Sequence, residues 1–251
     1  MMRFSRAIIA ASVLVIGGAS VADASAQEKS APSSSSNNTA ATAPAKQQAA
    51  PQTTEWGDDF KGSALDESKW ERFSFEGAGG GKAEVKDGQI QLRSGSKTRA
   101  GIRSKETFAS DRVIVEARLA KVGAALPEAG DKASPLGFAS LTLLFDGSGR
   151  NRVEWILTSE GTFEAWSVVD GRSERIDNRK LGTKLKNPVL AVVRRGDEFL
   201  FVLNGPDSPA EAAQVGLTKV IKNLPRTFHV MLYGFGSSEN NWDSVRVVAV
   251  K

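Results

Sequence analysis

The segment from Arg112 to Val122 is the sequence feature that most narrows the folds open to this chain. Its residues alternate, with apolar side chains on one side at Val113, Val115, Ala117 and Leu119. The other side carries charged side chains at Arg112, Glu116 and Arg118. A period of two residues is typical of a β-strand that buries one of its faces. We therefore expect a long, half-buried strand here.

Short segments of the same kind, separated by turn residues, make up most of the rest of the chain after residue 55. We expect strands at 83–86, 89–92, 136–145, 152–158, 162–169, 188–194, 198–203, 214–221, 227–235 and 242–250. Residues 209–213 alone have a helical pattern. About a dozen short strands with hardly a helix predict an all-β sandwich or jelly roll.

The N-terminal 26 residues have the layout of a secretory signal peptide. Arg3 and Arg6 precede an apolar run at 7–16, and Ala24, Ser25 and Ala26 form a small-residue cleavage site. An uncleaved membrane anchor is the alternative, but the run is short for a span, which needs about 20 residues. We expect cleavage after Ala26, no membrane span in the mature chain, and a periplasmic or extracellular location.

Residues 27–54 are rich in Ser, Ala, Pro and Gln, with almost no large apolar side chains. Such a segment buries too little surface to offset its ordering entropy, so we expect a disordered linker. The remaining residues, 55–251, suit one sandwich domain with its own core.

Composition excludes several classes of function. The chain has no cysteine, which removes thiol catalysis and zinc–thiolate sites. Its formal net charge is +4, and removal of Arg3, Arg6 and Asp23 with the signal peptide leaves +3. This nearly balanced charge argues against nucleic acid as a partner.

Four segments resemble patterns of the concanavalin A-like lectin and glucanase superfamily, in particular its laminin-G-like and family 16 glycoside hydrolase-like members. They are WGDDFKGSALDESKW at 56–70, AGIRSKETFASDRVIVEARLAK at 100–121, PVLAVVRRGDEFLFVLNG at 188–205 and NNWDSVRVVAV at 240–250. Asp111 replaces the usual turn glycine of the second pattern. The resemblance implies a concanavalin A-like jelly-roll sandwich of two antiparallel sheets over nearly all of 56–251.

The resemblance also indicates which catalytic residues are missing. Family 16 glycoside hydrolases carry E-x-D-x-E on one strand, and the corresponding strand here reads VEWILTSE at 153–160. Glu154 matches the first acid, but Ile156 replaces the aspartate, and Thr158 and Ser159 replace the second glutamate. We therefore expect no hydrolysis by that mechanism, with Glu154 as the remaining catalytic candidate. A different pair drawn from Glu154, Glu164 and Glu116 is the open alternative.

Members of the superfamily bind sugars on the concave sheet, and this implies a set of candidate ligand-binding residues. Polar candidates are Arg103, Arg152, Glu154 and Tyr233, together with the loop at 123–137, and aromatic candidates are Trp155 and Trp166. If the turn at Glu160 and Gly161 holds two residues, the two tryptophans face each other across a hairpin. The pair then either forms a sugar platform or, if Glu154 faces the concave surface, lies in the core. His229 sits in an apolar strand, and we interpret it as structural.

Two further expectations concern metal and partner. The resemblance implies a structural calcium held near the start of the domain and by the closing strand, here by Gly57, Asp58 and Asp243; the alternative is that Asp243 only shapes the final strand. No cofactor is otherwise required. We expect an exported, non-catalytic domain that binds a glycan or polysaccharide. The alternatives are a divergent glycoside hydrolase or lyase, and an envelope protein-interaction domain with an exposed apolar patch.

Overall fold

The computed structural model describes residues 53–75, 81–95, 98–109, 111–123, 136–181, 185–204 and 215–250. The expected signal peptide, nearly all of the linker, most of the loop at 123–137 and the helix at 209–213 lie outside these residues. The first strand begins at Thr53, two residues before the expected start of the domain. No helix among the described residues is long and apolar enough to cross a membrane.

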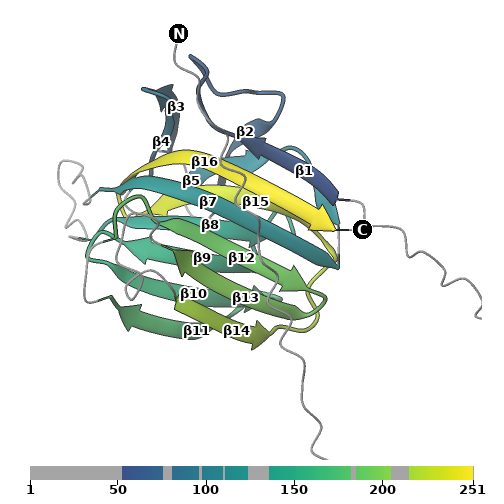
Figure 1. The fold of residues 1–251 in the computed structure, drawn as a ribbon. Coiled ribbons are helices and arrows are strands. Elements are labelled where there is room, and N and C mark those ends of the chain that lie inside the picture. The colour runs from purple at the N-terminus through teal and green to yellow at the C-terminus, as the bar shows by residue number, and fades with distance from the viewer. Residues whose placement is uncertain are drawn as a thin grey trace, which may run out of the picture. The chain divides into compact units, whose positions relative to one another are not determined.

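The described residues form two antiparallel sheets of eight strands each (Figure 1). Sheet A has the order β14-β13-β12-β7-β16-β4-β3, with β1 added beside β16. Its strands are β1 (Thr53–Asp58), β3 (Lys82–Lys86), β4 (Gln89–Arg93), β7 (Arg112–Val122), β12 (Val189–Arg195), β13 (Glu198–Asn204), β14 (Val215–Val220) and β16 (Glu239–Val250).

Sheet B has the order β11-β10-β9-β8-β15-β5-β2, with β6 beside β15. Its strands are β2 (Trp70–Phe75), β5 (Arg99–Ser104), β6 (Phe108–Ala109), β8 (Phe138–Leu144), β9 (Arg152–Thr158), β10 (Thr162–Val169), β11 (Arg172–Lys180) and β15 (Thr227–Phe235). The all-β jelly-roll sandwich of two antiparallel sheets is thus confirmed.

The core lies between the inner faces of the two sheets. The alternating strand β7 contributes its four apolar residues, of which Val115 and Leu119 are fully buried. Sheet B contributes the inner residues of β9. The centre of the Trp155 ring lies 5.0 Å from that of Phe163 and 5.6 Å from that of Phe201 in sheet A. Alternation along strands of both sheets therefore builds one continuous core.

Strand β11 is one of the strands that sequence analysis missed, together with β1 and β2. It reads RSERIDNRK, and most of its side chains are exposed. It lies at the edge of sheet B and pairs only with β10. An edge strand of this kind has no buried face to impose alternation, and its charges discourage pairing with other chains.

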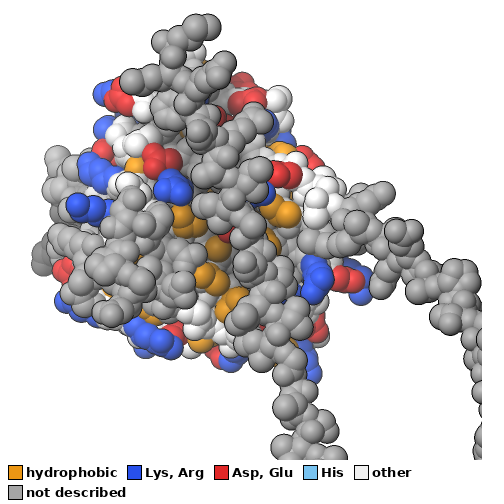
Figure 2. All heavy atoms as spheres, viewed as in Figure 1, with side chains coloured by type: hydrophobic (Ala, Val, Ile, Leu, Met, Phe, Trp, Pro, Cys, Tyr) orange, Lys and Arg blue, Asp and Glu red, His pale blue; other side chains and the backbone are white. Residues whose placement is uncertain are grey.

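The outer face of sheet B is only partly polar, which determines where a site can form. A second apolar cluster lies there, formed by Phe75, Leu144, Met231 and Tyr233, with Phe73 and Phe235 packed against it. On the face that Figure 2 shows, hydrophobic side chains gather in the middle, and charged side chains of both signs lie around them. The outer face of sheet B thus offers an apolar cluster next to the buried polar side chains Arg152 and Glu154.

Candidate functional site

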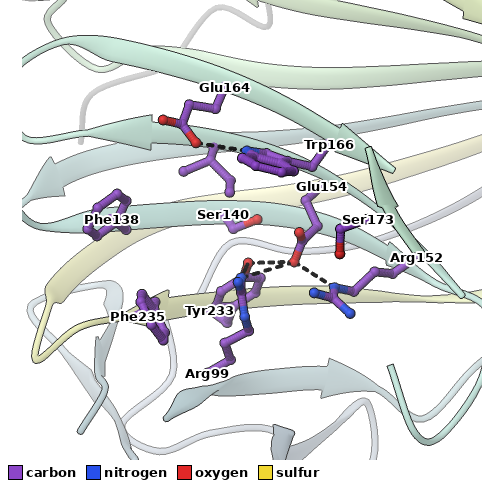
Figure 3. A pocket seen from close by; sticks show the side chains of 11 residues that line it. Arg99, Phe138, Ser140, Arg152, Glu154, Glu164, Trp166, Ser173, Tyr233 and Phe235 are labelled. Carbon is purple, nitrogen blue, oxygen red and sulfur yellow. Dashed lines mark hydrogen bonds and ion pairs between the residues drawn. The ribbon is translucent and has the colours of Figure 1, made fainter. Parts of the chain in front are cut away.

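A pocket of about 220 Å³ lies on the outer face of sheet B. Its walls come from strands β5, β8, β9, β10, β11 and β15 (Figure 3). The lining residues are Arg99, Phe138, Ser140, Arg152, Glu154, Ile156, Glu164, Trp166, Ser173, Tyr233 and Phe235. Four of the predicted ligand residues, Arg152, Glu154, Trp166 and Tyr233, thus line one cavity.

The two tryptophans of the β9–β10 hairpin lie on opposite faces of sheet B. Trp155 pairs with Ala165, and Trp166 pairs with Glu154. The expectation that Trp155 and Trp166 face each other is therefore wrong, as is the idea that both enter the core together. Trp155 is fully buried between the sheets, whereas Trp166 is half-buried and lines the pocket beside Glu154.

The length of the turn is the reason for this register. Strand β9 ends at Thr158 and β10 begins at Thr162, so three residues connect them rather than two. Gly161 is the last of the three and has φ of +78°, a left-handed conformation that glycine adopts at little cost. A left-handed residue at this position is typical of three-residue hairpin loops. One extra residue in the turn moves Trp166 to the other face.

Glu154 is the centre of a buried charged cluster, and its side chain is 3% exposed. Its Oε1 accepts hydrogen bonds from Arg152 Nε at 2.8 Å and from the Tyr233 hydroxyl at 2.7 Å. A guanidinium nitrogen of Arg99 lies 3.3 Å from the same oxygen. Burying a carboxylate is costly unless it is paired and hydrogen-bonded, and here two cations and a hydroxyl meet that requirement (Figure 3).

Tyr233, the single tyrosine of the chain, connects the cluster to strand β15. Its hydroxyl accepts a hydrogen bond from Arg99 at 2.7 Å and donates one to Glu154. Burial, and after it the charge of Glu154, raise the pKa of the Tyr233 hydroxyl well above its usual range. The hydroxyl therefore keeps its proton and serves as a fixed donor.

Gly101 is what lets strand β5 approach Tyr233. It lies opposite Tyr233 in the ladder between β5 and β15. A Cβ atom at position 101 would lie 1.9 Å from the Leu232 carbonyl oxygen and 2.7 Å from the Tyr233 Cα atom. Only glycine fits such a close approach of the two strands. The same approach brings Arg99, two residues from Gly101 and on the same face of β5, to the Tyr233 hydroxyl.

Trp166 and Glu164 form the wall of the pocket that β10 contributes. The indole Nε1 of Trp166 donates a hydrogen bond to Glu164 Oε2 at 2.7 Å, and Asn178 Nδ2 donates to Glu164 Oε1 at 2.8 Å. These bonds fix the orientation of the ring and of the carboxylate. A fixed, half-buried indole beside hydrogen-bonding groups can stack on the apolar face of a pyranose ring.

Two of the three carboxylates from which an alternative catalytic pair could be drawn line the pocket. Glu154 and Glu164 both line it, whereas Glu116 lies on β7 of sheet A, opposite Ala191 and Arg246. Ile156 is opposite Glu164 and lies on the same face as Glu154, where the resemblance places an aspartate. An apolar side chain therefore occupies the position of the second acid.

Two predicted ligand residues lie outside the pocket. Arg103 donates to Glu71 Oε1 through Nε and a terminal nitrogen, at 2.9 and 2.6 Å, and stacks 4.0 Å above the centre of the Phe73 ring. Trp155 belongs to the core. His229 Nδ1 lies 2.7 Å from the Ser104 carbonyl oxygen, away from the pocket lining.

Sequence reasoning missed several residues of the pocket. They are Arg99, Phe138, Ser140, Ile156, Ser173 and Phe235. Alternation along β5 could have placed Arg99 on the same face as Arg103, but nothing local indicates that it meets Tyr233. That contact depends on the register between β5 and β15, which are distant in the sequence.

The predicted calcium ligands Gly57, Asp58 and Asp243 all accept hydrogen bonds from donors of the protein itself. Asp58 accepts hydrogen bonds from the Phe60 amide at 2.9 Å and from Trp70 Nε1 at 2.8 Å. Asp243 accepts one from Gln89 Nε2 at 2.9 Å, and Gly57 is held in the β1–β16 ladder. Across the described residues, no group of three or more His, Cys, Asp or Glu side chains is placed to hold a metal ion. Asp58 and Asp243 therefore act as acceptors for different protein donors.

Comparisons with known proteins establish the fold. No protein-family model matches the sequence, and no curated protein matches it. Among solved structures, a prokaryotic β-1,3-1,4-glucanase (lichenase) derived from a mouse hindgut metagenome is similar, with a TM-score of 0.54 and 14% identity over 77% of this chain and 98% of the other.

Two further solved structures are similar to the same degree. The CBM2 module of the evolved Dit protein of Lactobacillus casei BL23 phage J-1 has a TM-score of 0.56 and 12% identity over 80% of this chain and 97% of the other. Arcelin-5, a lectin-like defense protein from Phaseolus vulgaris, has a TM-score of 0.53 and 9% identity over 79% and 98%. At such identities the similarity shows the fold alone, a jelly-roll sandwich of two antiparallel sheets.

Proposed function

We propose that this chain is an exported carbohydrate-binding domain that holds its glycan in the pocket on sheet B without cleaving it. The observation that carries the proposal is Trp166, a half-buried indole whose orientation is fixed by Glu164 and which shares a cavity with the Glu154 cluster. Sugar sites combine such a flat apolar surface with a few fixed polar groups, and this pocket has both.

The neighbours of the fold support the same class of ligand. They include a glucanase, a carbohydrate-binding module and a lectin-like protein, all similar to this chain over three quarters or more of its length. The sequence features of the N-terminus support export. A polysaccharide outside the cell is therefore the ligand class that fits both the pocket and the expected location.

The arrangement of the acids favours binding over hydrolysis. A glycosidase needs one carboxylic acid that gives a proton and a second carboxylate at a suitable distance, about 5 to 9.5 Å depending on mechanism. The contacts that position Glu154 all come from donors, so its Oε1 accepts and does not donate. Ile156 takes the place of an acid beside it.

A glycoside hydrolase is the second candidate, because Glu154 and Glu164 line the same pocket from neighbouring strands. Glu164 is a diagonal neighbour of Glu154 across the two strands, and residues in such positions lie about 7–8 Å apart.

A protein-interaction domain has less support: among the described residues, Val220 is the only large hydrophobic side chain that is mostly exposed, at 54%.

The test is a polysaccharide pull-down with the purified protein and two variants at one position. Trp166→Ala removes the stacking surface, and Trp166→Phe keeps an aromatic ring but loses the bond to Glu164. We expect binding without release of reducing ends, loss of binding in Trp166→Ala, and partial binding in Trp166→Phe. The thermal unfolding midpoint of each variant shows that the fold is intact.

Two outcomes would overturn the proposal. If Trp166→Ala binds polysaccharide as well as the parent protein does, the pocket is not the site. If reducing ends accumulate and Glu164→Gln abolishes their release, the protein is a hydrolase and the second candidate replaces the first.

A further inference from the structure

A β-bulge in strand β11 determines which side chain stands beside Trp166. Along the β10–β11 ladder, Glu164 pairs with Asn178 and Ala165 with Asp177, but Trp166 pairs with Arg175. The register shifts by one residue between Ala165 and Trp166, so the bulge is at Ile176. Bulges of this kind re-aim side chains and are frequent near binding sites.

The bulge exchanges an apolar side chain for a cation on the pocket face. In a regular ladder Ile176 would lie opposite Trp166, with its side chain on the same face as the indole. Instead Ile176 is half-buried and packs against the main core. Arg175 takes its place, with its guanidinium carbon 5.8 Å from the centre of the Trp166 ring.

Arg175 is an exposed cation that no neighbouring acid neutralises by an ion pair. Nearby acids have other partners: Asp177 pairs with Arg179 at 2.7 Å, and Glu174 pairs with Lys219 at 2.7 Å. Glu164 is bound by Trp166 and Asn178. Within the described part of the chain, Arg175 contacts the indole and forms no ion pair with a carboxylate.

We propose that Arg175 determines specificity, and that the glycan bound beside Trp166 carries an anionic group that pairs with this guanidinium. The inference rests on the proposed function, since it assumes that a sugar stacks on Trp166. A guanidinium presents paired donors that match the two oxygens of a carboxylate or sulfate. A sugar on the indole would place such a substituent next to Arg175, at the margin of the pocket.

The test uses ligands that differ in charge but not in backbone. Oligogalacturonates are compared with the same oligomers after methyl esterification, which removes the negative charge. A sulfated oligosaccharide is compared in the same way with its desulfated form, which distinguishes sulfate from carboxylate. Affinities are measured by calorimetry for the parent protein and for Arg175→Gln, Arg175→Lys and Trp166→Ala. Arg172→Gln is the matched control, because it removes the same charge from the same strand on the opposite face.

We expect the parent protein to bind one of the two anionic oligomers at least tenfold more tightly than the neutral form of the same oligomer, the typical effect of about one charge-assisted hydrogen bond. Arg175→Gln should remove this preference, Arg175→Lys should keep part of it, and Arg172→Gln should not change it. The preference should weaken as salt is added, because the pair is exposed.

The failures of the two proposals are distinguishable. If the neutral and anionic oligomers bind equally, through Trp166 and without an effect of Arg175→Gln, the role of Arg175 is overturned and carbohydrate binding stands. If no oligomer binds while the pull-down still shows Trp166-dependent binding of polysaccharide, the role of Arg175 is overturned and carbohydrate binding stands. If binding depends on Trp166 in neither measurement, both proposals are overturned.

Discussion

The two faces of strand β9 are buried alike but are stabilised by different interactions. All seven residues from Arg152 to Thr158 are buried. On the inner face, Trp155 packs among aromatic rings between the sheets, where removal of apolar surface from water provides the stability. On the outer face, Arg152 and Glu154 are buried as an ion pair, and Glu154 also binds Arg99 and the Tyr233 hydroxyl. One face of the strand thus supports the fold and the other holds the candidate site.

Truncation of the inner tryptophan should have the largest effect. Trp155→Ala leaves a cavity among Phe163 and Phe201 and removes the Nε1 hydrogen bond to the Val202 carbonyl oxygen. We expect the free energy of unfolding to fall by about 3–5 kcal/mol in urea denaturation. Trp166→Ala, on the half-buried outer ring, should cost about 1–2 kcal/mol. Equal losses would contradict the assignment of the two rings to different faces.

Neutralising the carboxylate on the outer face should have the next largest effect. Glu154→Gln leaves Arg99 and Arg152 without their common anionic partner, and we expect a loss of about 2–3 kcal/mol in the free energy of unfolding. Glu116→Gln is the control, since it makes the same change on sheet A, where the residue is half-buried, and should cost no more than about 0.5 kcal/mol. A loss at Glu154 as small as that at Glu116 would mean that the cluster does not stabilise the outer face.

The hydroxyl of Tyr233 can be observed directly, because the chain has one tyrosine. Its pKa is raised in the folded state, by burial first and by the charge of Glu154 second. The contribution to stability is therefore complete below the unfolded value of about 10 and is lost as pH rises above it. Tyrosinate absorbance near 295 nm should stay low in the folded protein at pH values where the urea-unfolded chain has already titrated.

Tyr233→Phe sharpens this measurement. It should cost about 1–2 kcal/mol at neutral pH through the lost hydrogen bonds to Glu154 and Arg99. It should also flatten the decline of stability above pH 10. If the folded protein and the unfolded chain titrate together, the hydroxyl is accessible to water and the cluster is more open than the contacts indicate.

The fold was more predictable than the site because it depends on local patterns. Alternation along β7 is enough to tell which of its side chains enter the core. The site depends on registers between strands: Arg99 meets Tyr233 through the pairing of β5 with β15, and Trp166 reaches the pocket through the length of one turn. The edge strand β11 was missed because it buries no alternating face. Arg175 lies on this strand and was therefore not predicted as a site residue.

The smallest expected effect concerns the turn that separates the two tryptophans. Gly161→Ala forces a side chain into a left-handed conformation, which should cost about 1 kcal/mol in the free energy of unfolding. Gly147→Ala is the matched control, because no atom lies within 4 Å of a Cβ atom there and its φ is not in that region, so stability should not fall. Equal stability of the two variants would show that glycine does not hold the three-residue turn. The register that brings Trp166 to the pocket face would then have to be fixed by the cross-strand contacts of Glu154 and Trp155, so that the core and the site would each determine the position of the other.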